Sequence, residues 1–406
     1  MEPVSMLLRR CLVLLVLLAA APLSAADYRI DYRIGFDPDA GLARVVVDYR
    51  PGEGRVSRFD FNAPAARYRN AEADGSLVRE GGRLLWEPPE AGGSLRMDYR
   101  IDRRRRDGGY DARITPDWVI VRGDHLVPAA VVTASRGAES RAQLHFDLPE
   151  GWSVETGWPR SDDARFEVEN PERRFSRPTG WMVAGDIGVR REQHPDTEVV
   201  VAGPRNEGVR RNEILGVTNL VLPEMREAFG SLPPKILIVS AGDPMWRGGL
   251  SGPNSLYMHA ERPLISENGT STLVHELVHM VTRIAGTHEP WIAEGTAEFY
   301  ALELLRRVGL ISEARHARGL DWMRERGSSV RELRHVRAHG PVTARAVTLF
   351  ADLDAELREA SGGEADLDAL MRALMEIRAP TLRQLQAAYE ALAGRPSQVL
   401  QAPELR

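Results

Sequence analysis

The 406-residue sequence contains one cysteine, Cys11, and one lysine, Lys235. A single cysteine excludes an internal disulfide. Because nearly all positive charge is arginine dispersed among acids, and the net charge is −5, we expect no basic face for nucleic acid. Hydrophobic residues make up 43% and charged residues 27%, which excludes a disordered or fibrous chain. The length fits two domains.

No apolar run reaches the roughly 20 residues of a membrane-spanning helix. The N-terminal apolar run, residues 11–21, is about half that length and follows Arg9 and Arg10. Small residues at Ser24 and Ala26 complete the pattern of a signal peptide over residues 1–26, cut after Ala26 or one residue earlier. We therefore expect an exported protein, periplasmic or secreted, with no permanent membrane span.

Residues 27–204 have the pattern of short strands joined by turns. Turn pairs such as Asp74-Gly75 and Gly92-Gly93 separate segments that are β-rich or alternate between apolar and polar residues. These segments are 43–50, 94–103, 118–122, 142–148 and 197–202. Several short strands at such spacing predict a β-sandwich-like N-terminal domain.

After residue 204 the apolar period becomes helical. Ile214, Val217, Val221 and Met225 have helical spacing, and residues 235–240 form a buried-strand run. From residue 271 the chain is mostly helical. The sequence thus predicts an α+β protein whose second domain, residues 205–406, is mainly helical.

The segment 270–286 contains His-Glu-x-x-His. Its histidines, His275 and His279, are four residues apart and therefore stand one turn apart on one helix face. That spacing lets two imidazoles reach one Zn²⁺ at about 2.0–2.1 Å. Glu276 lies beside the metal position and can take a proton from water there. We expect this helix to begin at Ser or Thr and to stop at Gly286. The alternative interpretation is a helix with two surface histidines.

A third ligand follows in the next predicted helix, which has Pro290 in its first turn. Glu294 follows His279 after a gap of 14 residues, and two histidines with one glutamate leave a fourth position for water, as in catalytic zinc sites. Glu298 lies one turn further on the same face. It fits an acceptor for an imidazole N–H, although a surface glutamate would show the same pattern. Trp291 is expected to pack the helix entrance.

These two segments, His-Glu-x-x-His and Trp-Ile-Ala-Glu-Gly-x-Ala-Glu-Phe-Tyr, resemble the gluzincin superfamily of thermolysin-like and aminopeptidase-like zinc peptidases. More closely, the mature chain resembles the glycyl aminopeptidase family. Weaker similarities occur in order along the chain, at Gly151-Trp152, 229–233, Gly248-Gly249-Leu250 and 353–363. The resemblance implies a β-rich N-terminal domain, a thermolysin-like catalytic domain and bound zinc.

The sequence departs from that family in three places. Ser251 and Gly252 follow Gly-Gly-Leu where the family has Glu-His, and Arg345-Ala346 stands where it has a Lys-Gly pair preceded by tyrosine. Many members also carry a PDZ domain, which we do not expect in a sequence whose last residue is Arg406. The second departure removes a candidate oxyanion donor. Tyr257, His335 and His339 could replace it, or be ordinary aromatic and surface residues, and His288 could line the site or be a loop residue.

The first departure bears on the substrate. An aminopeptidase must bind the free α-ammonium with a carboxylate, which Ser251 cannot provide. Glu261 or Glu267 could substitute from nearby. We therefore expect cleavage within peptides, or tolerance of dipeptides, and not strict aminopeptidase activity. Gly248, Gly249 and Leu250 could form a strand edge for an extended peptide, or a simple turn.

The sequence thus predicts zinc-dependent peptide hydrolysis, with His275, His279 and Glu294 as ligands and Glu276 as general base. Two alternatives belong to other classes. A pseudopeptidase would use the same fold to bind peptides or envelope partners, as the missing tyrosine would allow. A zinc hydrolase of non-peptide substrates would cleave esters or amides. Peptide or protein is the expected substrate.

Overall fold

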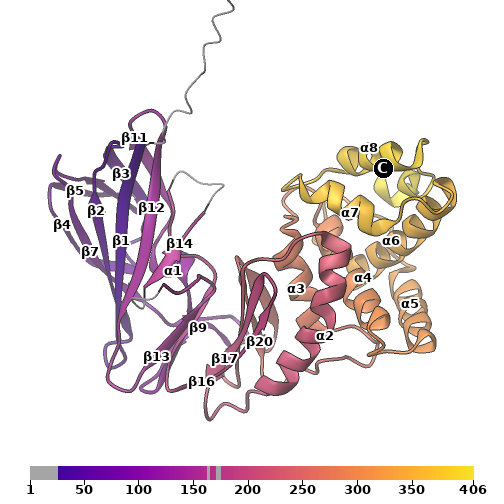
Figure 1. The fold of residues 1–406 in the computed structure, drawn as a ribbon, viewed down its shortest axis with the longest axis horizontal. Coiled ribbons are helices and arrows are strands. Elements are labelled where there is room, and N and C mark those ends of the chain that lie inside the picture. The colour runs from indigo at the N-terminus through magenta and orange to yellow at the C-terminus, as the bar shows by residue number, and fades with distance from the viewer. Residues whose placement is uncertain (1–25, 162–164, 171–174) are drawn as a thin grey trace, which may run out of the picture.

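A computed structural model describes residues 26–161, 165–170 and 175–406. The predicted signal peptide lies outside these residues except for Ala26, where the first strand begins. The α+β class is confirmed, since the described residues form four sheets and eight α-helices. Figure 1 shows the strands gathered in the first half of the chain and the helices in the second. Within the described part, no helix is both long and apolar enough to cross a membrane.

Two antiparallel-rich sheets share the N-terminal core. The first has the order β14 (Phe166–Val168), β12 (Ala138–Asp147), β1 (Ala26–Asp37), β2 (Leu42–Arg50), β7 (Gly93–Arg100) and β4 (Tyr68–Ala73). The second has the order β11 (Ala130–Ala134), β3 (Val56–Asn62), β6 (Arg83–Glu87) and β5 (Ser76–Glu80). Tyr49 of β2 meets Phe59 of β3 with ring centroids 5.6 Å apart. The alternating apolar faces of the two sheets therefore pack on each other.

A third sheet lies between this core and the rest of the molecule. Its order is β13 (Ser153–Thr156), β15 (Trp181–Gly185), β10 (Trp118–Arg122), β9 (Tyr110–Ile114) and β8 (Arg103–Arg104), and the short helix α1 (Gly123–Leu126) follows β10. Met182 and Ala184 of β15 face the N-terminal core, whereas Trp181 and Val183 belong to a separate core shared with the next sheet. This strand is buried on both faces because side chains alternate across it.

The fourth sheet crosses the predicted domain boundary at residue 204. Its order is β16 (Ile187–His194), β17 (Thr197–Pro204), β18 (Lys235–Ala241), β20 (Ser255–His259) and β19 (Gly249–Gly252). β17 pairs in parallel with β18, so strands from both sides of residue 204 belong to one sheet. The predicted boundary near residue 204 therefore falls within one sheet, and the division into two domains stays a prediction. β19 is an edge strand and pairs only with β20 among the described strands.

The helices pack on this sheet and on one another. They are α2 (Arg211–Phe229), α3 (Thr272–Thr282), α4 (Pro290–Arg307), α5 (Glu313–Gly327), α6 (Pro341–Ala360), α7 (Leu367–Met375) and α8 (Leu382–Ala393), followed by two 3-10 turns, Val399–Gln401 and Pro403–Leu405. Their core includes Val199, Ile236 and Leu256 from the sheet. Residues of the sheet therefore share one hydrophobic core with α3 and α4.

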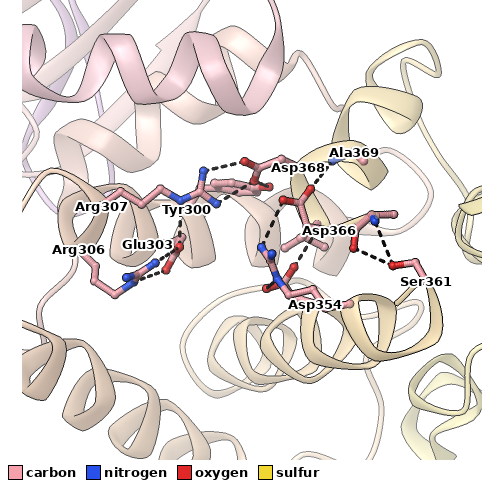
Figure 2. A network of polar contacts seen from close by, with 12 residues as sticks. Tyr300, Glu303, Arg306, Arg307, Asp354, Ser361, Asp366, Asp368 and Ala369 are labelled. Carbon is pink, nitrogen blue, oxygen red and sulfur yellow. Dashed lines mark hydrogen bonds and ion pairs between the residues drawn. The ribbon is translucent and has the colours of Figure 1, made fainter. Parts of the chain in front are cut away.

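A buried polar network fixes α4 against α7. Figure 2 shows Tyr300 and Arg307 of α4 directed at Asp368 of α7. The Tyr300 hydroxyl donates to Oδ1 of Asp368 over 2.7 Å, and Nη1 of Arg307 lies 2.7 Å from Oδ2. Glu303 of the same helix accepts from Arg307 over 2.9 Å. The C-terminal half of α4 is thereby anchored away from the end that carries Glu294.

Candidate metal centre

α3 begins and ends through local interactions. The Ser271 side chain accepts the backbone N–H of Val274 at 3.3 Å, as expected of an N-cap residue. The helix ends at Thr282, four residues before the predicted stop at Gly286. Arg283 takes a left-handed conformation with φ 53°, and the N–H of Ala285 donates to Arg378 at 2.7 Å. The chain therefore leaves the helix early because a tertiary hydrogen bond replaces a helical one.

Packing of Trp291 and a hydrogen bond from its indole fix the start of α4. Pro290 occupies the first turn, as predicted. Trp291 is fully buried, stacks on Phe350 of α6 with centroids 5.8 Å apart, and donates from Nε1 to Glu289 at 3.0 Å. The prediction that Trp291 packs the helix entrance is confirmed. This contact fixes the first turn of α4, and Glu294 follows it on the side of the helix that faces α3.

Three side chains from α3 and α4 converge on one point. Nε2 of His275 lies 3.1 Å from Nε2 of His279. The carboxylate of Glu294 lies 3.6 Å from the first nitrogen and 3.5 Å from the second. One ligand atom from each residue falls within 4.8 Å of the others. A tetrahedral zinc ion with bonds of about 2.0–2.1 Å holds its nitrogens about 3.3 Å apart, so the spacing fits such an ion.

Glu298 lies behind the first histidine. Its Oε2 atom is 2.8 Å from Nδ1 of His275, on the ring position opposite Nε2. A carboxylate at that position fixes the ring orientation and holds a proton on Nδ1, which leaves Nε2 available as a ligand. The spacing of one helical turn between Glu294 and Glu298 therefore lets one helix contribute both a possible ligand and its orienting partner.

The carboxylates of Glu294 and Glu298 place negative charge around the two histidines. Burial alone would lower the pKa of His275, but the interactions with Glu294 and Glu298 outweigh it and raise that pKa to about 10. Burial would likewise raise the pKa of Glu294, whereas the two histidines lower it well below its usual range. The site thus favours positive charge between these residues, supplied either by a proton or by a metal ion.

Glu276 is held beside this point by the edge strand. Its Oε2 atom accepts the backbone N–H of Ser251 at 2.7 Å, and its side chain is buried. A Cβ atom at Gly249 would meet Cγ2 of Thr272 at 2.6 Å and Cγ of Glu276 at 3.0 Å. Glycine is therefore required at 249 for β19 to approach α3 closely enough to make this hydrogen bond.

A cleft of about 560 Å³ opens over these groups. His275, Glu276, His279 and Glu294 line it together with residues 249–254 of β19 and the following turn. Gly249 and Leu250 therefore lie where a docked peptide was expected. Gly248 does not line the cleft; its carbonyl accepts the N–H of His259, and the ring of Trp246 covers it.

The candidates for the oxyanion donor and for the ammonium-binding carboxylate lie outside the cleft. Tyr257 is buried, and its hydroxyl is directed at the carbonyl of Trp246, 3.2 Å away. The exposed residues His288, His335 and His339 do not line the cleft. Glu261 pairs with Arg247 at 3.1 Å, and Glu267 borders a separate depression. These positions do not supply the oxyanion donor or the ammonium-binding carboxylate that the sequence left open.

Sequence reasoning missed the far wall of the cleft. Trp158, Asn170 and Thr179 come from the β-rich region, and Arg283 and Arg378 come from the segments after α3 and α7. A Cβ atom at Gly157 would lie 2.8 Å from the carbonyl of Asn254, which shows how closely the first region packs on the turn after β19. Such contacts join residues about a hundred positions apart and have no local sequence pattern.

Comparison with known proteins identifies the fold. No protein-family model and no curated protein matches the sequence. Among solved structures, the chain is similar to an aminopeptidase N family protein from Idiomarina loihiensis, with a TM-score of 0.63. The identity is 14%, over 86% of this chain and 70% of that one. The two chains therefore share a fold.

Proposed function

We propose that this protein is a zinc-dependent peptidase of the gluzincin type, with His275, His279 and Glu294 as metal ligands and Glu276 as general base. The observation that carries the proposal is the convergence of the two Nε2 atoms, 3.1 Å apart, and the Glu294 carboxylate beside Glu276 in one cleft. The likeness in fold to an aminopeptidase N family protein supports the same class of reaction.

The donor set suits zinc in a catalytic role. Two imidazoles and one carboxylate leave a fourth position open, whereas structural zinc sites use four protein ligands. When bound, zinc would polarise the scissile carbonyl and lower the pKa of the attacking water toward 7. Glu298 serves this site indirectly, by orienting His275 through Nδ1.

Glu276 would take the proton of the attacking water and pass it to the leaving amine. The N–H of Ser251 keeps its carboxylate fixed at the floor of the cleft. Because proton transfer needs heavy atoms within hydrogen-bond reach, a carboxylate fixed in this way loses little entropy when the substrate arrives.

The edge strand β19 offers a place for the substrate. An extended peptide adds to such an edge by main-chain hydrogen bonds, and side-chain specificity comes from the surrounding walls. Since Ser251 of β19 touches Glu276, a peptide running along this edge passes next to the proposed base.

We further propose that a thermolysin-like catalytic region follows a β-rich N-terminal one and that the chain is exported after removal of residues 1–26.

Replacing Glu276 with glutamine tests the proposal. The amide cannot accept the proton but leaves both histidines and Glu294 intact, so Glu276→Gln should retain zinc and lose at least about 100-fold in turnover of an unstructured protein. Glu267→Gln, which lies outside the cleft, is the matched control and should behave like the parent. Wild-type turnover by Glu276→Gln would remove Glu276 from the mechanism. Zinc binding without cleavage by the parent would favour the pseudopeptidase, and cleavage of esters alone would favour a non-peptide hydrolase.

A further inference from the structure

One peptide unit of the edge strand β19 connects the proposed general base to the β-rich part of the chain. The N–H of Ser251 donates to Oε2 of Glu276 over 2.7 Å. The carbonyl of Leu250 belongs to the same peptide unit, and it accepts a hydrogen bond from Nε1 of Trp181 over 2.7 Å. Because a peptide unit is planar, a hydrogen bond to its carbonyl also fixes the direction of its N–H. Trp181 and Glu276 therefore hold one rigid peptide unit between them.

The strand that carries this peptide unit is short and lies at the edge of its sheet. β19 has four residues and pairs only with β20 among the described strands. Gly249 and Gly252 at its two ends leave the backbone more conformational freedom than other residues would. A strand with few contacts opens more easily than a central one, so each contact that fixes it has a measurable effect.

Trp181 itself is held firmly on β15. The side chain is buried, and its ring lies 5.2 Å from that of Tyr257 on β20. The guanidinium of Arg122 lies over the indole at 5.6 Å. The backbone N–H of Trp181 donates to Oγ of Ser255 over 2.7 Å. A side chain locked by packing and hydrogen bonds defines the position of the group that it contacts.

Close approach of two backbone segments makes these hydrogen bonds possible. Gly180, directly before Trp181, has a positive φ of 77°, and a Cβ atom there would clash with the carbonyl of Pro253. A Cβ atom at Gly252 would lie 3.2 Å from Cα of Gly180. Glycine at both positions therefore lets the start of β15 meet the turn between β19 and β20.

We propose that Trp181 is a positioning residue for Glu276, an inference that rests on the proposed peptidase function. Trp181 is not among the described residues that line the cleft, so its effect on the reaction passes through the peptide unit of Leu250 and Ser251. The N–H of that unit holds the carboxylate of Glu276, and the rate of proton transfer depends steeply on the position of the base. The β-rich part of the chain thereby contributes to catalysis without contacting the reacting atoms.

Two replacements at position 181 separate this role from packing. Trp181→Phe removes the indole N–H together with some volume, and a tryptophan analogue with sulfur in place of the indole N–H removes the donor alone. Each should lower kcat about 3–10-fold, because one neutral hydrogen bond is lost, and should leave KM and zinc affinity unchanged. Trp118→Phe is the matched control and should retain kcat, since Trp118 is buried in the same core but pairs with Gly185 at the other end of β15. A higher KM with unchanged kcat would show that Trp181 only shapes the cleft, and would overturn the inference.

A double-mutant cycle tests whether Trp181 acts through Glu276. In the Glu276→Gln background, Trp181→Phe should cause no further fall in kcat, because no base remains to be positioned. A purely structural role would reduce the residual rate by the same factor as in the parent. An equal fall in both backgrounds, or a wild-type kcat for the sulfur analogue, would overturn the inference while the peptidase function stands.

Hydrogen exchange of the Ser251 amide, followed by NMR, gives a readout that does not need turnover. Glu276 accepts this N–H in the parent, and the sulfur analogue at position 181 should raise its exchange rate about 3–10-fold. Trp118→Phe should leave the rate unchanged. Unchanged exchange in the sulfur analogue would overturn the inference. Absence of cleavage by the zinc-loaded parent would overturn the proposed function instead, and the exchange rate would still decide whether Trp181 fixes the peptide unit that holds Glu276.

Discussion

Nδ1 of His275 lies 2.8 Å from Oε2 of Glu298, while the Nε2 atom of the same ring faces His279 and Glu294. The two acids of α4 thus contact opposite sides of one imidazole. Glu298 follows His279 after a gap of 18 residues, a spacing also used within the superfamily that the chain resembles, so the spacing alone does not exclude Glu298 as the ligand in place of Glu294. The position of Glu298 behind the ring supports the orienting role proposed for it.

Alanine at Glu298 should therefore weaken zinc binding by about 10–100-fold, and alanine at Glu294 should weaken it more. Competition with a chelator of known affinity measures both. Glu325→Ala, an exposed glutamate on α5, is the control and should leave the affinity unchanged. A larger loss for Glu298→Ala than for Glu294→Ala would reverse the assignment.

The acids that line the cleft also predict whether cleavage requires a free N-terminus on the peptide. Glu276 and Glu294 are the only acids among the described lining residues, so a free α-ammonium finds no separate carboxylate there. Peptides with an acetylated N-terminus should therefore be cleaved at least as fast as matched free peptides. Product analysis by mass spectrometry gives the positions. Strict dependence on a free amine would contradict this and indicate an acid outside the described lining.

The sequence predicted the convergence of the three candidate ligands better than it predicted the walls of the cleft. His275 and His279 are fixed by the period of one helix, and Glu294 by the start of the next, so their convergence needs only the contact between α3 and α4. The wall formed by Trp158 and Thr179 depends instead on packing of the β-rich region against the turn after β19, which leaves no periodic signal.

The predicted boundary near residue 204 rests on a change of period, and it stays a prediction. The change from strand to helix period there is real, since β17 ends at Pro204 and α2 begins at Arg211. Parallel pairing of β17 with β18 then joins the two sides, because a helical crossover connects parallel strands. A change of period marks a change of element, which need not be a change of domain.

The anchor of α4 on α7 gives a stability prediction. Burial would raise the pKa of Asp368, but hydrogen bonds from Arg307 and Tyr300 lower it below its ordinary value. An acid with a depressed folded-state pKa stabilises the fold above its unfolded pKa of about 3.9 and loses that contribution as the pH falls. Asp368→Asn should thus reduce the free energy of unfolding by about 2–4 kcal/mol at pH 7, since it leaves Arg307 without one of its partners.

Denaturant titration at several pH values checks this prediction. The difference between Asp368→Asn and the parent should shrink below about pH 4, because the unfolded parent binds a proton there that folded Asp368 binds only at a lower pH. Asp352→Asn, at an exposed position of α6, should change the stability by less than about 0.5 kcal/mol. A difference that stays constant down to pH 2 would show that the charge of Asp368 is not its source.

Cleavage of an unstructured protein before chelation, after chelation and after zinc is restored tests the central claim most directly. Two imidazoles and a carboxylate converge on one point, so the purified protein should hold one zinc ion per chain. Chelation should abolish cleavage, and stoichiometric zinc should restore it in the parent but not in His275→Ala or His279→Ala. Cleavage that continues unchanged after complete removal of metal would contradict the account.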